Sequence, residues 1–349
     1  MDQGYINSRV RGMYRSLLGP EEFRAFLQKP DLEAMIADLQ KTPYRSALEL
    51  SCVRRSGVTC LEEALRIHLV RTYSKIVKMF GDNDAVRYVR IVVNRWDVHN
   101  LKAILRGKNI HSPPEKIREC LVPAGTLDEA TLIELLNQQD VRDVIDLLAT
   151  WGVDYARAFT PHIEEWSRSR ELLVMEHALD QYYFEYARRT VEGKKPEAIA
   201  LRRLVGTEID VTNLKTVITF IRDGVGPEDG GRFLLEGGAD LPRELLRSMI
   251  EDGTLPTALG RLEGTPYAFL LRICDETPVC GPQSLLMKEL DRHLVRTGAA
   301  LYRSDPLSVS VVVGYLYLFL VEVTNLRIIA RCRDAGLSDE ELEAELIHV

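Results

Sequence analysis

Three short stretches of this chain repeat one pattern at an almost constant spacing. Residues 97–102 read DVHNLK, residues 210–215 read DVTNLK and residues 322–327 read EVTNLR. The acids are 113 and 112 residues apart, which indicates internal duplication with a period too long for a solenoid, so each repeat should be a small helical domain. The signature residues are Asp97, Asn100 and Lys102, then Asp210, Asn213 and Lys215, and finally Glu322, Asn325 and Arg327.

A tyrosine marker runs in phase with this signature. Tyr44, Tyr155 and Tyr267 are 111 and 112 residues apart. Each follows a predicted short helix and precedes a longer one. The short helices are expected at residues 32–39, 141–148 and 255–262, and the long ones at residues 61–77, 172–187 and 285–301. The predicted domains are residues 44–150, 151–262 and 263–349, preceded by an N-terminal segment, residues 1–43.

The third repeat contains no closing short helix before Val349. Residues 21–44 have the pattern of that missing piece, because they combine a short acidic and apolar helix with the tyrosine marker. We therefore expect the N-terminal segment to close the third repeat.

Composition and periodicity predict an all-α protein. The chain has 349 residues and is 46% hydrophobic, which is enough for a large core. Apolar residues recur at the i, i+3, i+4 spacing of helices around the first two signatures, with Pro and Gly clusters between helices and no convincing set of strands. The net charge of −7 argues against nucleic acid as the main partner.

The most apolar run, residues 309–321, raises the alternative of a membrane span. It has 13 residues, against about 20 needed to cross a bilayer. In the same register, the first repeat carries Arg87, Arg90 and Arg95. Equivalent helices should share an environment, so we expect a buried helix of a water-soluble body.

Within each signature, the acid and the asparagine lie three residues apart and share a partly buried helix face. Buried carboxylates and amides need hydrogen-bond partners. The favoured interpretation is a tie from each asparagine to a neighbouring backbone, and the alternative is a ligand site. The base, five residues after the acid, is about 140° away around the helix. It would pair with another helix or face a partner protein.

Known chemical motifs are missing from the sequence. There is no phosphate-binding loop and no H-E-x-x-H, and the spacing of Cys274, Cys280 and His293 fits no zinc pattern. The six cysteines are scattered without a CxxC pair, so free thiols in an intracellular protein are expected. We therefore predict no catalytic residue, no cofactor, no metal and no direct nucleotide binding.

The chain resembles the C subunit of the prokaryotic A/V-type rotary ATPases, which is related to the d subunit of eukaryotic V-ATPases. Residues 5–13, YINSRVRGM, look like the family's opening Y-x-N-A-R-V-R-A-M, with Ser8 and Gly12 in place of alanines. The three acid-x-x-Asn-Leu-Lys/Arg signatures look like its internal repeat. Glu322 and Arg327 depart from Asp and Lys, although both keep the charge.

The resemblance implies three similar helical domains that form a funnel around a pseudo-threefold axis. It also implies a peripheral, non-catalytic central-stalk subunit on the cytoplasmic face of the membrane. Its partners would be the proteolipid rotor ring and the helical central-shaft subunits, and it would transmit rotation for ATP synthesis and for proton or sodium transport. Two alternatives stay open: a helical scaffold or adaptor unrelated to ion transport, and a helical hydrolase or lyase.

Overall fold

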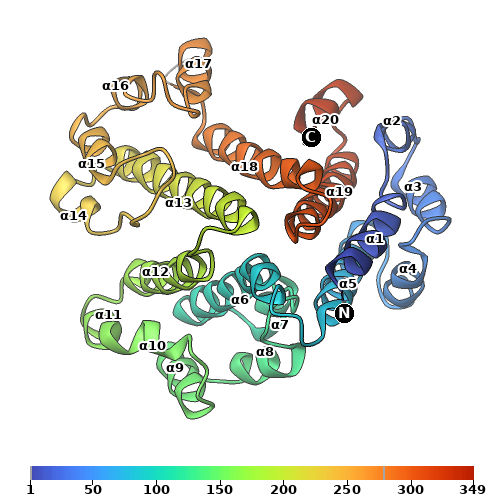
Figure 1. Cartoon of the computed structure of the whole chain (residues 1–349), viewed down its shortest axis with the longest axis horizontal. Coiled ribbons are helices and arrows are strands. Elements are labelled where there is room, and N and C mark those ends of the chain that lie inside the picture. Colours follow the sequence, from blue (N-terminus) through green and yellow to red (C-terminus); the bar gives the residue numbers. More distant parts are fainter. Residues whose placement is uncertain (1, 278–279) are drawn as a thin grey trace. The chain divides into compact units, whose positions relative to one another are not determined.

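The computed structural model describes residues 2–277 and 280–349, and every regular element in that part of the chain is a helix. The all-α prediction is therefore confirmed. The chain divides into two compact units, whose helices are labelled in Figure 1. Unit 1 comprises Met1–Leu147 and Ala299–Val349, and unit 2 comprises Leu148–Gly298. The division into three repeats stays a prediction.

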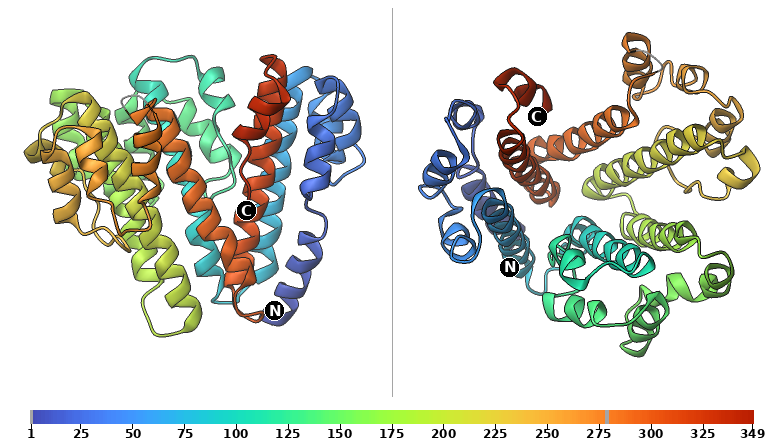
Figure 2. Two further views of the ribbon diagram at one scale, coloured as in Figure 1. Left: turned by 90° about the horizontal axis from the view of Figure 1, so that it is seen from above. Right: turned by 180° about the vertical axis from the view of Figure 1, so that it is seen from behind.

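Unit 1 is built on three long helices, α5 (Gly57–Phe80), α6 (Val86–Asn109) and α19 (Ser310–Asp334). Helix α19 runs alongside α5, as the left view of Figure 2 shows, and it also contacts α6. The shorter helices of this unit are α1 (Gln3–Tyr14), α2 (Pro20–Leu27), α3 (Leu32–Leu39), α4 (Arg45–Ser51), α7 (Pro114–Glu119), α8 (Glu129–Leu136), α9 (Val141–Thr150, which continues into unit 2), η3 (Leu301–Arg303) and α20 (Asp339–Glu345).

Unit 2 also has three long helices, α12 (Leu172–Thr190), α13 (Pro196–Asp223) and α18 (Gln283–Ala300, whose last two residues belong to unit 1). Helix α13 packs against α12 and against two short helices that follow it in the chain, α15 and α16. The shorter helices are α10 (Ala156–Phe159), η1 (Thr160–His162), α11 (Ile163–Ser169), α14 (Pro227–Gly231), α15 (Arg243–Glu251), α16 (Leu255–Gly260) and α17 (Phe269–Glu276).

Local capping signals explain where several helices begin and end. Helix α3 spans the predicted residues, and the Asp31 carboxylate at its start accepts a 2.8 Å bond from the amide of Ala34. The Ser338 hydroxyl likewise accepts from the amide of Glu341 at the start of α20. Helix α13 ends at Gly224, whose φ of 70° is the left-handed conformation typical of helix C-termini.

The apolar run of residues 309–321 lies in α19, which is long and apolar enough by composition to span a membrane. In the structure, 72% of its most apolar window is buried. Gly314 lets this helix approach η3 closely, because a Cβ atom at that position would lie 2.1 Å from the backbone nitrogen of Tyr302. The prediction of a buried core helix is confirmed.

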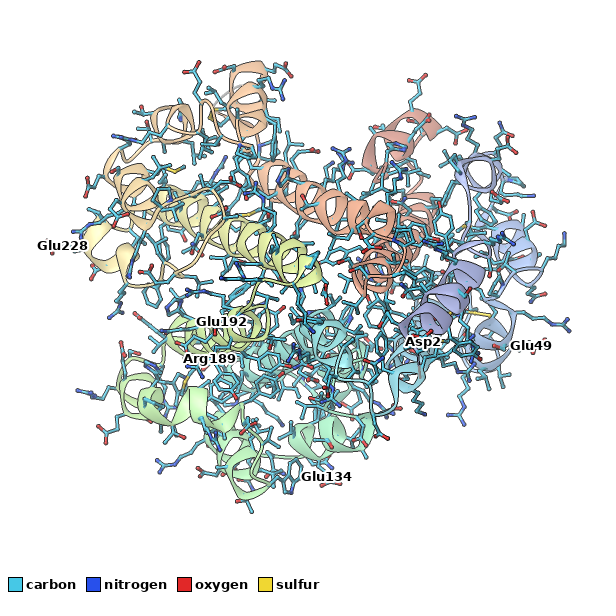
Figure 3. The ribbon with its side chains drawn as sticks, viewed as in Figure 1. Asp2, Glu49, Glu134, Arg189, Glu192 and Glu228 are labelled. Carbon is cyan, nitrogen blue, oxygen red and sulfur yellow. A yellow bond between two sulfur atoms is a disulfide. The ribbon has the colours of Figure 1, made fainter. Side chains whose placement is uncertain are left out.

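Charged side chains lie mainly on the outside of each unit. Figure 3 labels several that project away from the ribbon, including Glu49 and Glu134 in unit 1 and Glu228 in unit 2. The acids of the three signatures are exceptions, since Asp97, Asp210 and Glu322 are all buried. Burial of a carboxylate requires donors, so these three acids mark the sites to be explained.

Candidate functional site: three buried acid and asparagine joints

Each signature asparagine clamps a backbone segment that lies 22 residues further along the chain. On α13, the Asn213 amide nitrogen donates to the Leu235 carbonyl at 2.9 Å, and its oxygen accepts from the Leu235 amide at 2.8 Å. The same two bonds join Asn100 on α6 to Val122 and Asn325 on α19 to Ile347. Each amide therefore supplies the hydrogen bonds that an irregular buried segment would otherwise lack.

In unit 1, the carboxylate of Asp97 holds the loop that follows Val122. Its oxygens accept from the backbone amides of Thr126 and Leu127, both at 2.9 Å, and from the Thr126 hydroxyl at 2.6 Å. Three donors on one buried carboxylate offset much of the cost of removing it from water.

In unit 2, the carboxylate of Asp210 holds the equivalent loop. One carboxylate oxygen accepts from the amides of Ala239 and Asp240, at 3.0 and 2.8 Å, which lie 29 and 30 residues ahead, as in the Asp97 loop. The same oxygen lies 3.2 Å from the Tyr267 hydroxyl, so the acid also receives a bond from the tyrosine marker. One side chain thus fixes both the loop and the segment that begins the next predicted repeat.

Glu322 makes the corresponding contacts with the N-terminal part of unit 1. The Tyr44 hydroxyl donates to one carboxylate oxygen at 2.6 Å, and the backbone amide of Leu18 donates to the other. The donors come from residues that precede the acid by 278 and 304 positions. A glutamate is one methylene longer than the aspartate of the other two signatures, and it reaches donors on a separate segment.

Two glycines complete the aspartate joints, and the sequence reasoning missed them. A Cβ atom on Gly125 would lie 1.9 Å from an Asp97 carboxylate oxygen, and one on Gly238 would lie 2.0 Å from an Asp210 oxygen. Only glycine lets the loop backbone come this close to the acid. The sequence contains a signal that could have identified them, because each glycine follows its aspartate by 28 residues.

Burial raises the pKa of two of these acids. The pKa of Glu322, only 4% exposed, rises to about 7, although the bonds from Tyr44 and Leu18 act in the opposite direction. Burial likewise raises the pKa of Asp210 to about 6. Their tyrosine partners respond in the same sense, because burial and the neighbouring acid raise the pKa of Tyr44 and of Tyr267. The Asp210 and Glu322 joints are therefore linked to proton binding near neutral pH.

The three signature bases do not share one environment. Lys215 pairs across to Asp291 on α18, with 2.5 Å between nitrogen and oxygen, as one of the two alternatives predicted. Arg327 is half-buried, has no hydrogen bond or ion pair within the described chain, and has its pKa lowered by burial. Lys102 on α6 is also half-buried.

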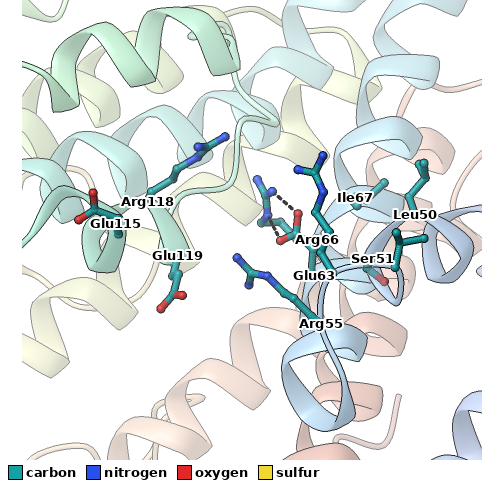
Figure 4. A pocket seen from close by; sticks show the side chains of 11 residues that line it. Leu50, Ser51, Arg55, Glu63, Arg66, Ile67, Glu115, Arg118 and Glu119 are labelled. Carbon is teal, nitrogen blue, oxygen red and sulfur yellow. Dashed lines mark hydrogen bonds and ion pairs between the residues drawn. The ribbon is translucent and has the colours of Figure 1, made fainter.

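A hollow of about 600 Å³ in unit 1 is another place where chemistry could lie (Figure 4). Its charges are partly paired: Arg66 donates two bonds to Glu63, at 2.9 and 2.6 Å, and these bonds hold the pKa of Glu63 below its ordinary value. The one hydroxyl in its lining, on Ser51, lies 3.3 Å from the Leu48 carbonyl. The lining therefore shows no hydroxyl paired with a basic side chain.

The expectation of free thiols is wrong for four of the six cysteines. The structure pairs Cys52 with Cys60 and Cys274 with Cys280, while Cys120 and Cys332 are free. The first pair closes the short connection between α4 and α5, and the two pairs join residues that are eight and six positions apart in sequence. In the described chain, no three His, Cys, Asp or Glu side chains are grouped so that they could hold a metal ion.

Buried ties of one kind recur on three long helices, α6, α13 and α19, and each holds backbone in place. The sequence matches the family model described as ATP synthase (C/AC39) subunit over residues 6–345, so the chain belongs to that family. This confirms the resemblance seen in the sequence.

Several archaeal proteins, each named as the C subunit of an A-type ATP synthase, are similar over nearly the whole chain. The Methanocaldococcus jannaschii protein is 26% identical over 344 residues, covering 98% of this chain and 86% of the relative. The Halobacterium salinarum protein (strain R1) is 28% identical, covering 98% and 97%. The Archaeoglobus fulgidus protein is 27% identical, covering 98% and 95%.

Proposed function

We propose that this chain is the non-catalytic central-stalk subunit of an A/V-type rotary ATPase. It would link the helical shaft subunits to the proteolipid rotor ring and transmit rotation for proton or sodium transport. It would act as a peripheral protein on the cytoplasmic face of the membrane. Family membership supports this proposal, since its relatives are named as C subunits of A-type ATP synthases.

One observation favours a mechanical role over a chemical one. The repeated pattern of acids and asparagines in the signatures makes hydrogen bonds within the protein. Each of the three asparagines bonds to the backbone of one residue, and the acids accept hydrogen bonds from loop amides and from tyrosine hydroxyls. These contacts lie on helices of 24, 28 and 25 residues, about 36–42 Å long. A body that passes torque between two partners must resist bending, and buried hydrogen bonds on long helices contribute to this stiffness.

We also propose that the three repeats form a funnel around a pseudo-threefold axis, with the N-terminal segment closing the third. The bonds from Leu18 and Tyr44 to Glu322 support this closure, because they match those made to Asp210 by its own loop and by Tyr267. The funnel would hold the foot of the shaft. Helix-end loops would meet the ring through small or polar contacts, because a threefold body cannot repeat one contact evenly on a ring of different symmetry.

The test removes this chain from the assembled complex and restores it. We expect the depleted complex to hydrolyse ATP without moving ions, and we expect added protein to restore the coupling. If hydrolysis by the isolated soluble head also depended on this chain, the coupling role would be wrong. Failure to co-purify with a proteolipid ring would favour a scaffold unrelated to ion transport.

A further inference from the structure

One carboxylate holds both ends of an N-terminal segment, which we define as residues 18–44. Glu322 on α19 accepts from the Leu18 amide at the beginning of the segment and from the Tyr44 hydroxyl at its end. Between these points the segment contains α2 and α3. The two aspartates hold loops that follow them within 30 residues in the sequence, whereas residues 18–44 are far from α19 in the sequence and meet it only in the folded chain.

The segment has few other polar ties to the C-terminal part of unit 1. Arg333, near the end of α19, donates to the Leu27 carbonyl, and α2 and α3 pack against α20, α19 and α5. Helix α1 is fixed separately, because the Asn7 amide donates to the carbonyls of Pro306 and Ser308 at 2.8 and 3.0 Å. The Glu322 contacts therefore fix both ends of residues 18–44 independently of α1, while apolar side chains such as Met35 and Leu39 anchor the middle of the segment.

Solvent can reach the joint. Glu322 lines a pocket of about 270 Å³ between α1, α4, α5 and α19, and the rim of this pocket includes the exposed residues Ser16, Ser46, Arg71 and Lys75. A proton can thus exchange with the carboxylate while the rest of the unit stays folded.

We propose that Glu322 is a proton-sensitive latch that holds residues 18–44 against α19 when it is neutral and releases them when it ionises. The latch lies within one chain, so it does not depend on the coupling role proposed above.

The groups around the carboxylate set the direction of this response. Helix α5 presents Arg71 and Lys75 across the pocket, together with His68, whose own burial lowers its pKa to about 4 and leaves it neutral. The N-terminal segment presents Tyr44 and Glu22, and the charge of Glu22 disfavours a second anion. From α19 itself, Tyr315 lines the same pocket. Burial outweighs the hydrogen bonds from Tyr44 and Leu18, which favour the ionised form, and raises the pKa of Glu322 to about 7.

The direction of the pH response follows from the pKa of Glu322 in the two states of the latch. When the segment is seated, Glu322 has a pKa near 7, and when the segment is released the acid meets water and regains its ordinary value of 4.5. The released state therefore binds fewer protons, so rising pH favours release. Between pH 6 and pH 8, these two values predict a rise of about tenfold in the ratio of released to seated protein.

Hydrogen exchange of the full-length protein tests the latch. Protection of the backbone amides of residues 18–44 is measured at pH 6, 7 and 8 and corrected for the intrinsic pH dependence of exchange. We expect the corrected opening constant to rise about tenfold in the wild type and to stay flat in Glu322→Gln, which keeps the shape of the side chain without its charge. Asp210→Asn in unit 2 is the matched control and should keep the wild-type response in residues 18–44.

A second variant covers the case in which Glu322→Gln does not fold. Tyr44→Phe removes the hydroxyl that lowers the pKa of Glu322, so the midpoint of release should move to higher pH. A flat wild-type profile, a pH response retained in Glu322→Gln, or an unmoved midpoint in Tyr44→Phe would each overturn the latch.

Discussion

Replacing Asn213 by leucine tests whether the asparagine joints hold the fold together. The two side chains have the same branched shape, so the change removes both hydrogen bonds to Leu235 with little change in packing. The site is closed to water, since Asn213 is only 1% exposed. The Leu235 amide and carbonyl would both lose their side-chain partner in a buried place.

The expected cost follows from these two groups. An orphaned buried donor or acceptor costs about 1–3 kcal/mol, and the gain from burying an apolar leucine instead of an amide returns part of it. We expect a net loss of roughly 1–3 kcal/mol in the free energy of unfolding. Unit 2 spans Leu148–Gly298, and for a unit of this size the loss corresponds to a melting temperature lower by roughly 2–12 °C.

Thermal melts and hydrogen exchange together provide the assay. Exchange at the Leu235 amide should accelerate in the variant, which locates the effect at the joint. Asn94→Leu on α6 is the matched control, because the buried oxygen of Asn94 has no hydrogen-bond partner in the structure, and this change should be nearly neutral. An unchanged melting temperature together with unchanged protection at Leu235 would refute the structural interpretation of the signature.

Three further outcomes are expected. Burial raises the pKa of Asp210 from 3.8 to about 6, so the free energy of unfolding of unit 2 should fall by roughly 2–3 kcal/mol as the pH rises from 4 to 7. Urea melts of the wild type and of Asp210→Asn should therefore diverge over this range, and parallel pH profiles would contradict the prediction. Gly125→Ala should destabilise unit 1, because the new methyl group meets the Asp97 carboxylate, whereas Gly12→Ala on α1 meets no atom within 4 Å and should leave the melting temperature unchanged or raise it. The purified chain should stay monodisperse in gel filtration without detergent despite residues 309–321, and a need for detergent would contradict the burial of α19.

The sequence by itself determined the helices and the positions that matter on them. Helical periodicity is local, so α3 was predicted to the residue and α5, α12 and α18 to within a few residues. Duplication made the signature visible without a structure, because the acid, the asparagine and the base recur at one spacing. The expectation that the acids and asparagines need buried partners followed from their place on an apolar helix face.

Only the tertiary structure decided what those residues touch. Tyr44 and Leu18 reach Glu322 across 278 and 304 positions of sequence, and no local pattern specifies a hydrogen bond at that range. The thiol pairs escaped prediction because turn geometry, not cysteine spacing, brought Cys52 to Cys60. The raised pKa of Glu322 also arises only after folding, since desolvation depends on every segment packed around the carboxylate.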